Sequence, residues 1–353
     1  MLIKPDAKKI AKIKLVGVGG GGSNAVASMV TSEKIKGVDF IAINTDAQAL
    51  LTNKAEAKIQ VGEKITKGLG AGGDPEVGKQ AAEESRDKIN EYLEGADLVF
   101  ITCGEGGGTG TGAAPIVAEI AKQNDALTIA VVTKPFQFEG AKRMVIANEG
   151  ISKLKDKVDA LITIPNQKVL DFSDKKLTLL DAFKEVDSVL TQGVKGLSEI
   201  ITLPGLINVD FADVKTIMQN SGTAIMGIGL GTGERRAMQA VKHAMVSPLL
   251  EFSIDGARGI LFNIVGGENM TMQEVNEAAE SITKAADQNA QIIFGAVIDP
   301  TMSDDLKITL IATRFSDLKT KQVSEAIAEE RKETTDNNLD ELEIPAFLRK
   351  KVL

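Results

Sequence analysis

The first half of the chain alternates short apolar runs with stretches of helical periodicity. Five runs are almost continuously apolar, the pattern of strands that are covered on both faces. These runs lie at 13–18, 40–43, 98–102, 128–132 and 160–164. Amphipathic stretches between them lie near 75–93, 113–123 and 141–155. The alternation predicts an α/β fold with a parallel sheet flanked by helices, which binds ligands at the carboxyl ends of its strands.

The second half has a different order of elements. A long helical pattern over 176–200 ends at Leu203-Pro204-Gly205, and a shorter one follows near 211–219. Further on, Thr271 and Glu274 form a capping box for a helix expected near 272–287. The expected strands outnumber the helices here, and they lie near 223–230, 258–265, 291–298 and 306–314. The pattern predicts a long central helix followed by a second, mixed α+β domain.

These patterns divide the chain into five parts. A ligand-binding domain is expected over 11–175, a central helix over 176–203 and the α+β domain over 204–315. Residues 316–339 are polar and contain no Gly or Pro, so they form either a partly helical arm or a disordered tether. Hydrophobic residues return in 340–353, which we interpret as a partner-binding peptide, with a docked tail as the alternative.

Charge and hydropathy exclude several classes of function. The net charge is −8 and no dense Lys/Arg patch offsets it, so a non-specific nucleic-acid surface is not expected. No apolar stretch reaches the roughly 18 residues of a membrane span, and the N-terminus lacks the apolar core of a signal peptide.

The counts of cysteine and histidine narrow the possible chemistry. Cys103 is the only cysteine, which excludes an internal disulfide and a cysteine-based zinc site and fits a reducing cytosol. His243 is the only histidine, which argues against Ser-His-Asp catalysis, Cys-His catalysis and multi-histidine metal sites. It falls among Ala and Met residues of a predicted helix, where a structural role is expected.

The first of two glycine-rich loops follows the strand at 13–18 and opens a helix. Gly17, Gly19 and Gly22 satisfy the dinucleotide fingerprint G-x-G-x-x-G, whose backbone N–H groups cradle phosphate. The match alone is weak because it serves any phosphate ligand. A nicotinamide dinucleotide would need an acid at the end of the second strand, and Asp46 is the candidate. An NAD-dependent enzyme is therefore one alternative.

The second glycine-rich loop, at 104–112, also follows a strand, and a helix is expected from about Ala113. Two phosphate-type loops at neighbouring strand ends suit a polyphosphate held from both sides, which counts against a single nicotinamide cofactor. Residues 73–80 nearly match the Walker pattern, but Gln80 replaces the hydroxyl that would hold Mg²⁺ and no strand precedes them. We therefore expect Lys79 to be a solvated helix lysine.

The heptapeptide Gly-Gly-Gly-Thr-Gly-Thr-Gly at 106–112 resembles the signature of the tubulin/FtsZ GTPase family. Other segments resemble the family's remaining motifs in the same order along the chain. They are 17–24, 44–46, 70–75, 135–143, 164–166, 181–187, 208–213 and 344–349. The last of these resembles an adaptor-binding peptide of the bacterial cell-division branch.

The resemblance implies that the chain binds GTP or GDP with Mg²⁺. The implied contacts are Gly20, Gly21, Gly22, Ser23, Asn24, Asn44, Ala71, Gly72, Gly106, Gly107, Gly108, Thr109, Gly110, Glu139, Arg143, Asn166, Phe183 and Asp187. Chemistry supports guanine, because one carboxylate at Asp187 could accept both its N1–H and its exocyclic amine. Phe183 shares a helix face with Asp187 and could stack on the base. Without the resemblance, Glu139 and Arg143 would be interpreted as an i,i+4 ion pair on a helix.

Hydrolysis is expected to depend on the backbone and on a neighbouring molecule. No Walker lysine is in view, so the N–H groups of 107–110 should stabilise the γ-phosphate, with Mg²⁺ held through the phosphates. The resemblance implies that Asn208, Asp210 and Asp213 orient the attacking water in the nucleotide site of the next subunit of a head-to-tail filament. Without the resemblance, Asp210 would be interpreted as a helix N-cap that is followed by an acid in the first turn.

The resemblance also implies partners and a location. Membrane-bound division adaptors would bind Leu342, Ile344, Pro345, Phe347, Leu348 and Arg349, in the cytoplasm at the mid-cell ring. A cytomotive GTPase of plasmid segregation is the alternative, which the terminal peptide disfavours. Glu105 stands where the family has an apolar residue, and an acid beside a triphosphate is unfavourable unless it points away or contacts Mg²⁺.

Overall fold

The structure is a computed structural model that describes residues 11–32, 35, 37–172, 177–202, 205–247 and 253–315. The described residues up to Arg314 belong to one compact unit, and a second unit begins at Phe315. The expected linker over 316–339 and the peptide over 340–353 lie outside the described residues.

The centre of the fold is one ten-stranded sheet with the order β3-β2-β1-β4-β5-β6-β7-β10-β8-β9. The strands from β3 to β7 pair in parallel, whereas β10 pairs antiparallel with both β7 and β8. Their bounds are β1 Ile13–Val18, β2 Val38–Asn44, β3 Ala57–Gln60, β4 Leu98–Gly104, β5 Leu127–Lys134, β6 Ala160–Pro165, β7 Gly222–Thr232, β8 Gly259–Gly266, β9 Gln291–Ile298 and β10 Asp305–Thr313. The largely parallel sheet and the mixed second part confirm the predicted fold class.

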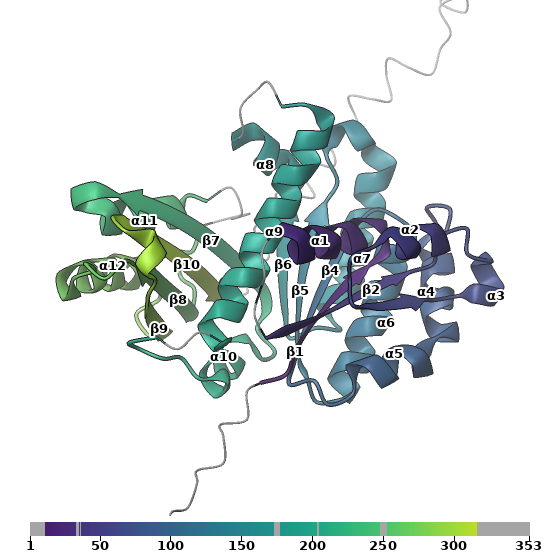
Figure 1. Cartoon of the computed structure of the whole chain (residues 1–353), viewed down its shortest axis with the longest axis horizontal. Coiled ribbons are helices and arrows are strands. Elements are labelled where there is room, and N and C mark those ends of the chain that lie inside the picture. Colours follow the sequence, from purple (N-terminus) through teal and green to yellow (C-terminus); the bar gives the residue numbers. More distant parts are fainter. Residues whose placement is uncertain are drawn as a thin grey trace, which may run out of the picture. The chain divides into compact units, whose positions relative to one another are not determined.

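Helices cover both faces of the parallel part of the sheet, and α9 runs between the parallel and the mixed strands (Figure 1). The helices are α1 Gly19–Ser32, α2 Ala47–Thr52, α3 Glu63–Thr66, α4 Pro75–Glu84, α5 Arg86–Leu93, α6 Thr109–Gln123, α7 Ala141–Lys155, α8 Asn166–Phe172, α9 Leu179–Thr202, α10 Phe211–Met218, α11 Arg236–Met245 and α12 Met272–Ala285. Short 3-10 turns are η1 Gln137–Glu139, η2 Gly233–Arg235 and η3 Pro300–Met302.

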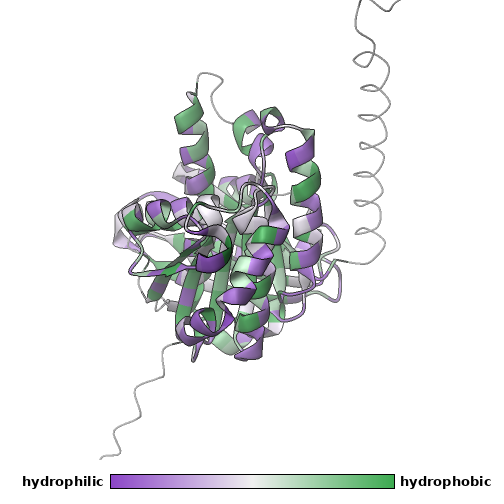
Figure 2. Ribbon diagram, turned by 90° about the vertical axis from the view of Figure 1, so that its right-hand side faces the viewer, coloured by the Kyte–Doolittle hydropathy of each residue, from purple (hydrophilic) through white to green (hydrophobic). Residues whose placement is uncertain are grey.

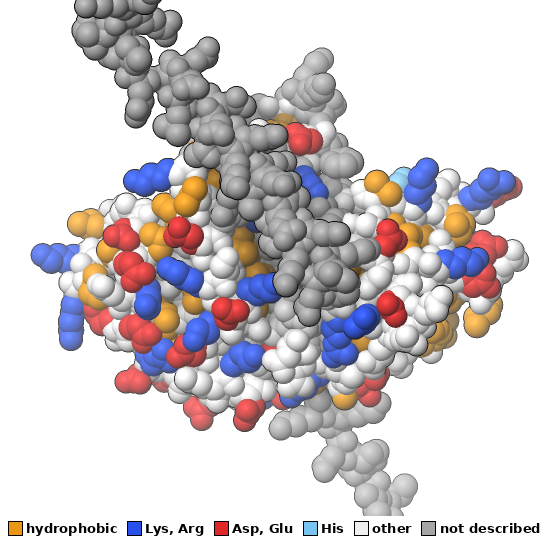
Figure 3. All heavy atoms as spheres, turned by 180° about the vertical axis from the view of Figure 1, so that it is seen from behind, with side chains coloured by type: hydrophobic (Ala, Val, Ile, Leu, Met, Phe, Trp, Pro, Cys, Tyr) orange, Lys and Arg blue, Asp and Glu red, His pale blue; other side chains and the backbone are white. Residues whose placement is uncertain are grey.

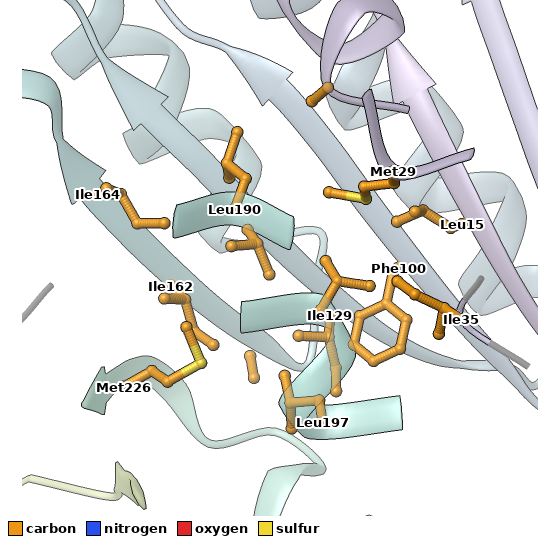
Figure 4. Close-up of a cluster of buried hydrophobic side chains, with 14 of the residues drawn as sticks. Leu15, Met29, Ile35, Phe100, Ile129, Ile162, Ile164, Leu190, Leu197 and Met226 are labelled. Carbon is orange, nitrogen blue, oxygen red and sulfur yellow. The ribbon is translucent and has the colours of Figure 1, made fainter. Parts of the chain in front are cut away.

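The continuously apolar strands face two separate hydrophobic cores. Leu15 and Phe100 point to the core that includes α1 and α9, and Val16 and Ile101 point to the core that includes α6. Successive side chains of a strand alternate between the faces of a sheet, so apolar residues at every position place a core on each side. Figure 4 shows the α9 core, where Leu197 lies close to Phe100 and Ile129.

A stripe of glycines fixes how the mixed part packs. Gly227, Gly229 and Gly231 alternate along β7, and a Cβ atom added to any of them would come within 1.9 Å of a backbone oxygen of α11. The helix can therefore lie directly on the strand. In the same region, His243 Nδ1 contacts the Leu230 carbonyl oxygen at 2.7 Å, which fits the expected structural role.

Most predicted boundaries hold within a few residues, and the exceptions have local causes. The expected capping box is present, since Thr271 and Glu274 satisfy each other's backbone N–H groups at the start of α12. The stretch at 75–93 was expected to be a single amphipathic segment, but it is two helices divided at Ser85. The short elements β3, α2, α3 and α8 were not predicted, because segments this short carry no clear hydrophobic period.

The surface is mixed in charge, and no helix among the described residues is long and apolar enough to span a bilayer. On the face shown in Figure 3, basic and acidic side chains are intermixed. In Figure 2 hydrophobic and hydrophilic residues alternate along the helices, as expected for amphipathic helices that pack on a sheet. The described surface therefore gives no support to a nucleic-acid-binding patch on that face.

Leu197→Ala should lower the free energy of unfolding by about 3 kcal/mol, because Leu197 is fully buried and truncation leaves a cavity between α9 and the sheet. Urea unfolding followed by circular dichroism measures this change. Leu180→Ala, on an exposed face of the same helix, is the matched control and should change the free energy by less than about 0.5 kcal/mol. Equal effects of the two variants would contradict the assigned packing of α9.

Candidate functional site

The strand order reverses at β1 and β4, and both glycine-rich loops begin there. From β1 the chain proceeds to β2 and β3 on one side, while β4 leads to β5 and β6 on the other. In open α/β sheets a ligand crevice forms outside the carboxyl ends of the strands at such a reversal. A cavity lies at this point and is lined by residues of both loops.

The first loop is tight enough that α1 starts at Gly19, immediately after β1. Gly19 has φ +72°, and a Cβ atom there would lie 2.5 Å from the Gly110 nitrogen of the second loop. A Cβ at Gly22 would lie 2.2 Å from the Thr102 oxygen. Gly20 and Gly21 line the cavity, and nothing lies within 4 Å of a Cβ built on Gly20. Glycine is thus required where the two loops touch, and the backbone faces open space beside that contact.

In the second loop, α6 begins at Thr109 rather than near Ala113, so the predicted helix start was wrong by one turn. Pro115 favoured the later start, because proline is commonest at the first helical position, but here it lies inside the helix. The earlier start brings the first turn of α6 to the cavity, which Gly107, Gly108, Thr109 and Gly110 line. The free N–H groups and the dipole of a helix N-terminus favour an anion at this end.

The loop before α4 forms a second wall at the same end. Ala71 and Gly73 line the cavity, and Asp74 caps α4 by accepting from the Glu76 nitrogen at 2.9 Å. Lys79 does not line this cavity and is exposed, as predicted for a solvated helix lysine. On the other side Asp46 caps α2 by accepting from the Gln48 and Ala49 nitrogens, and it is not among the residues that line the cavity.

The opposite end of the cavity is formed by α9 and by the residues that follow β5 and β6. Phe183, Asp187 and Leu190 line it from α9, and Asn166 lines it from the end of β6. Phe183 packs edge-on against Phe136, with ring centroids 5.3 Å apart. An aromatic ring, an apolar side chain and polar acceptors in one wall suit a flat heterocycle that carries hydrogen-bond donors.

Two acceptors in this wall have no partner among the described residues. The Asn166 Oδ1 atom is buried and accepts no hydrogen bond. The Asp187 carboxylate makes no side-chain hydrogen bond or ion pair, and burial raises its pKa to about 6. Buried acceptors are costly when they remain unsatisfied, so this wall is set for a ligand that donates to both.

Glu139 and Arg143 also line the cavity. They form the expected i,i+4 ion pair, with Nη1 2.7 Å from Oε2, and Glu139 Oε1 also accepts from the Phe136 nitrogen at 2.8 Å. Arg143 is the only cationic side chain among the described residues that line the cavity. An anionic ligand would therefore be held mainly by backbone N–H groups rather than by side-chain charge.

Glu105 lies at the start of the second loop and is buried, with 3% of its surface exposed. Its Oε1 atom accepts from the Cys103 thiol at 3.3 Å, and its Oε2 atom lies 2.3 Å from a Cβ built on Gly150 of α7. Burial raises the pKa of its carboxyl to about 7. The carboxyl is thus directed toward α7, and Glu105 is at the same time one of the residues that line the cavity.

The cavity gathers two thirds of the predicted contact residues. Those that line it are Gly20, Gly21, Ala71, Gly107, Gly108, Thr109, Gly110, Glu139, Arg143, Asn166, Phe183 and Asp187. Those that do not line it are Gly22, Ser23, Asn24, Asn44, Gly72 and Gly106. The lining also includes Gly73, Gly104, Glu105, Thr133, Pro135, Val186 and Leu190, which were not predicted as contacts. Val186 and Leu190 were detectable in principle, because they flank Asp187 at helical spacing.

Asn44 has a structural role in the described chain. Its Oδ1 atom accepts from the nitrogens of Thr45, at 2.9 Å, and Asp46, at 3.3 Å. The Thr45 hydroxyl in turn lies 2.7 Å from the Thr109 hydroxyl. Asn44 therefore supports the first turn of α6 through Thr45, and it is not among the residues that line the cavity.

The predicted catalytic residues do not reach the cavity within one chain. Asp210 and Asp213 form a reciprocal capping box at the start of α10, and Asn208 accepts from the Gly205 nitrogen at 2.6 Å. The far end of α10 is tied to the amino end of β6, since the Asn220 nitrogen donates to Asp159 Oδ1 at 3.3 Å. Asn166 lies at the carboxyl end of the same strand, so the capping box and the cavity are at opposite ends of the sheet.

No group of three or more His, Cys, Asp or Glu side chains in the described part of the chain could hold a metal ion by itself. A cation at this site would need ligands from a bound phosphate chain. The fit of a Mg²⁺–polyphosphate is supported by the open space at Gly20 and Gly107, beside the first turn of α6.

Comparison with known proteins agrees with this geometry. Residues 12–174 match the family model described as Tubulin/FtsZ family, GTPase domain, and residues 222–316 match FtsZ family, C-terminal domain. An FtsZ dimer from M. jannaschii is 49% identical, with a TM-score of 0.81, over 86% of this chain and 88% of that one.

Two more distant structures share the fold. CetZ2 from Haloferax volcanii, solved as a GTPγS-bound protofilament, is 22% identical with a TM-score of 0.74, over 91% of this chain and 99% of that one. CetZ1 from Haloferax volcanii, solved as a GDP-bound monomer, is 19% identical with a TM-score of 0.78 over the same shares.

The expected resemblance is thereby confirmed, and the NAD-dependent alternative is rejected. The glycine loops at the strand reversal, the order of elements and the identity over most of the chain all agree. The chain is a member of the tubulin/FtsZ GTPase family.

Proposed function

We propose that this chain binds GTP in the cavity, hydrolyses it at the contact between successive subunits, and assembles into the filaments of a bacterial division ring. The observation that carries the proposal is the pairing of two glycine loops and a helix N-terminus at one end of the cavity with two unpartnered acceptors at the other. Family membership supports GTP hydrolysis in general, because the matching domain is that of a GTPase family.

Guanine fits the base end better than adenine. Its N1–H and exocyclic amine are adjacent donors that the Asp187 carboxylate can accept together, whereas adenine would turn a ring acceptor toward it. The unpartnered Asn166 Oδ1 offers a further acceptor, and Phe183 offers a ring for stacking. Binding guanine would satisfy a carboxylate that burial leaves without a partner.

The phosphates would lie against the backbone of the two loops. The lining residues Gly20, Gly21 and 107–110 offer N–H groups rather than charge, and Arg143 adds one cation that Glu139 already holds. When bound, Mg²⁺ would neutralise phosphate charge and favour attack on the γ-phosphate. Preorganised backbone donors need no rearrangement as charge develops during the transfer.

Hydrolysis would use the capping box of a second molecule. From Asp187 to the end of α9 at Thr202 the helix spans about 22 Å, so Asp213 of the same chain is out of reach of the phosphates. A head-to-tail contact would bring the α10 end of one subunit to the cavity of the next. Such a contact joins two different surfaces and does not close, so it builds a filament. The M. jannaschii FtsZ dimer and the CetZ2 protofilament are related proteins that self-associate.

Asp187→Ala should weaken GTP binding by about 2 kcal/mol, roughly thirtyfold, because the guanine donors lose a charged acceptor. Isothermal titration measures the affinity, and Glu185→Ala, an exposed acid on the same helix, is the matched control. Inosine triphosphate lacks the exocyclic amine, so the wild type should bind it more weakly than GTP, and Asp187→Ala should not distinguish the two.

The Asp187 carboxylate also determines how the affinity for GTP changes at acid pH. Burial holds the pKa of Asp187 at about 6, and guanine requires the ionised form. The affinity for GTP should therefore fall more steeply below pH 6 in the wild type than in Asp187→Ala, since ionisation of the nucleotide affects both proteins alike. An unchanged affinity of the wild type down to pH 5 would contradict the assigned role.

Asp213→Ala should leave GTP binding intact while turnover falls by about a hundredfold, because the attacking water loses its acceptor. Phosphate release measures turnover, and turnover per molecule of the wild type should rise with protein concentration. Thr271→Ala, which breaks the equivalent capping box of α12, controls for the loss of a helix cap and should keep wild-type turnover.

A mixing experiment separates catalysis between molecules from catalysis within one. Asp213→Ala retains an intact cavity, and Asp187→Ala retains an intact α10 end. Mixed together, the two variants should release phosphate faster than either alone. If the mixture is no faster, the shared site is refuted.

We further propose that the C-terminal peptide binds membrane-bound division adaptors at mid-cell. The peptide lies outside the described residues, and its apolar and basic sequence supports this role. A chain that ends at Leu339 should keep GTP turnover and GTP-dependent sedimentation, but its fluorescent fusion should no longer gather in a mid-cell ring. Normal ring localisation of the truncated chain would contradict the proposal.

A further inference from the structure

Glu105 is a buried acid that the proposed function leaves unexplained. It follows the last residue of β4, and its backbone nitrogen donates to the Thr133 oxygen of β5 at 2.9 Å. Glu105 is one of the residues that line the nucleotide cavity, its carboxyl is directed toward Gly150 of α7, and its Oε2 atom accepts no hydrogen bond from any described residue. Such a group is costly when ionised, so its protonation state matters to the wall that it forms.

Glu105 packs into one cluster with Thr111 of α6 and Gly150 of α7. A Cβ atom on Gly150 would lie 2.3 Å from Glu105 Oε2 and 2.3 Å from Thr111 Cγ2, so α7 leaves the carboxyl no room to move outward. The Thr111 hydroxyl accepts from the Gly106 nitrogen at 2.9 Å. The cluster therefore holds the first residues of the second glycine loop in place.

Gly106 completes this arrangement. It has φ +94°, and a Cβ atom there would lie 2.7 Å from the Arg143 oxygen. The loop is thus pressed between α7 on one side and the Glu105–Thr111 contact on the other. Any shift of the Glu105 carboxyl would be passed to Gly106 and to the N–H groups that follow it.

Among the described residues, the neighbours of the Glu105 carboxyl come from β4, α7, α6 and β5. From β4 the neighbour is Cys103, whose thiol pKa burial raises well above its usual value, so it stays protonated. From α7, Arg143 lies against Gly106 and its guanidinium pairs with Glu139 at 2.7 Å, and Glu149 beside Gly150 is exposed. From α6 the neighbour is the uncharged Thr111, and from β5 it is the Thr133 backbone. An ionised Glu105 would lack a free cation among these groups.

Burial raises the pKa of Glu105 to about 7, an effect larger than the opposing one of its polar neighbours Cys103 and Thr111. A triphosphate in the cavity would add negative charge beside the same wall. An ionised Glu105 and a triphosphate would repel each other in a poorly solvated site. Binding of the triphosphate should therefore favour protonation of Glu105.

We infer that Glu105 is a positioning residue for the second glycine loop, and that the loop binds a nucleoside triphosphate most tightly when Glu105 carries its proton. The inference rests on the proposed function, because it takes the triphosphate to lie at this loop. Protonated, Glu105 is a neutral wall of the cavity. Ionised, it repels the phosphates and strains the cluster that fixes Gly106.

The test compares the pH dependence of binding in the wild type and in Glu105→Gln, a neutral side chain of the same shape. Isothermal titration with Mg²⁺ and the slowly hydrolysed analogue GTPγS gives the dissociation constant from pH 6.5 to 8.5. If the ligand raises the pKa of Glu105 by one unit, the wild-type affinity falls by up to about tenfold over this range. Glu105→Gln should keep the tighter affinity throughout.

The controls isolate the Glu105 proton. Ionisation of the nucleotide is the same for both proteins, so only the difference between their profiles counts. Glu149→Gln removes an exposed acid near Gly150 and should keep the wild-type profile. Glu105→Met is a second neutral variant of similar length, to be used if the amide disturbs folding. Its affinity for GTPγS should depend on pH as little as that of Glu105→Gln.

The outcomes distinguish this inference from the proposed function. If both neutral variants bind GTPγS with the wild-type pH profile, the role of Glu105 is refuted and the proposed function stands. If the wild type binds no guanine nucleotide at any pH, the proposed function itself fails. The fall in affinity below pH 6 should persist in Glu105→Gln, because it results from protonation of Asp187.

Discussion

The site depends on direct backbone contact between two glycine loops at the carboxyl ends of β1 and β4. A Cβ atom at Gly19 would meet the Gly110 nitrogen, and one at Gly22 would meet the Thr102 oxygen. Without side chains at these positions, the starts of α1 and α6 approach each other at the strand reversal. Their N–H groups then face one cavity, where a phosphate chain can be held by dipoles rather than by cations.

Glycines also allow close backbone packing where helices cover the sheet. Gly112 in α6 packs against the Pro75 oxygen of α4, and the glycines of β7 pack against α11. Close packing of this kind fixes the helices and the loops they carry. It also fixes α9, whose apolar face fills the core beneath β4 and β5 while its first turns carry Phe183 and Asp187 to the cavity.

Buried acids give the cavity its chemical character. Asp187 and Glu105 both lack a cationic partner, and burial raises the pKa of each. Their proposed roles are opposite, because guanine donors favour the ionised Asp187 whereas phosphate charge favours the protonated Glu105. One cavity would thus use an unpaired carboxylate to select the base and an uncharged carboxyl to tolerate the phosphates.

Hydrophobic periodicity and glycine spacing alone determined the fold class, the strands from β1 to β10 apart from the short β3, and the two phosphate-type loops. The sequence could not reveal that α6 begins at Thr109, because Pro115 favoured a later start, or that Asn44 accepts hydrogen bonds from the Thr45 and Asp46 nitrogens. Only the tertiary structure decided that Asp213 lies at the other end of the sheet from Asp187. Local patterns fix local conformation, whereas distances between segments far apart in the chain depend on how the helices pack on the sheet.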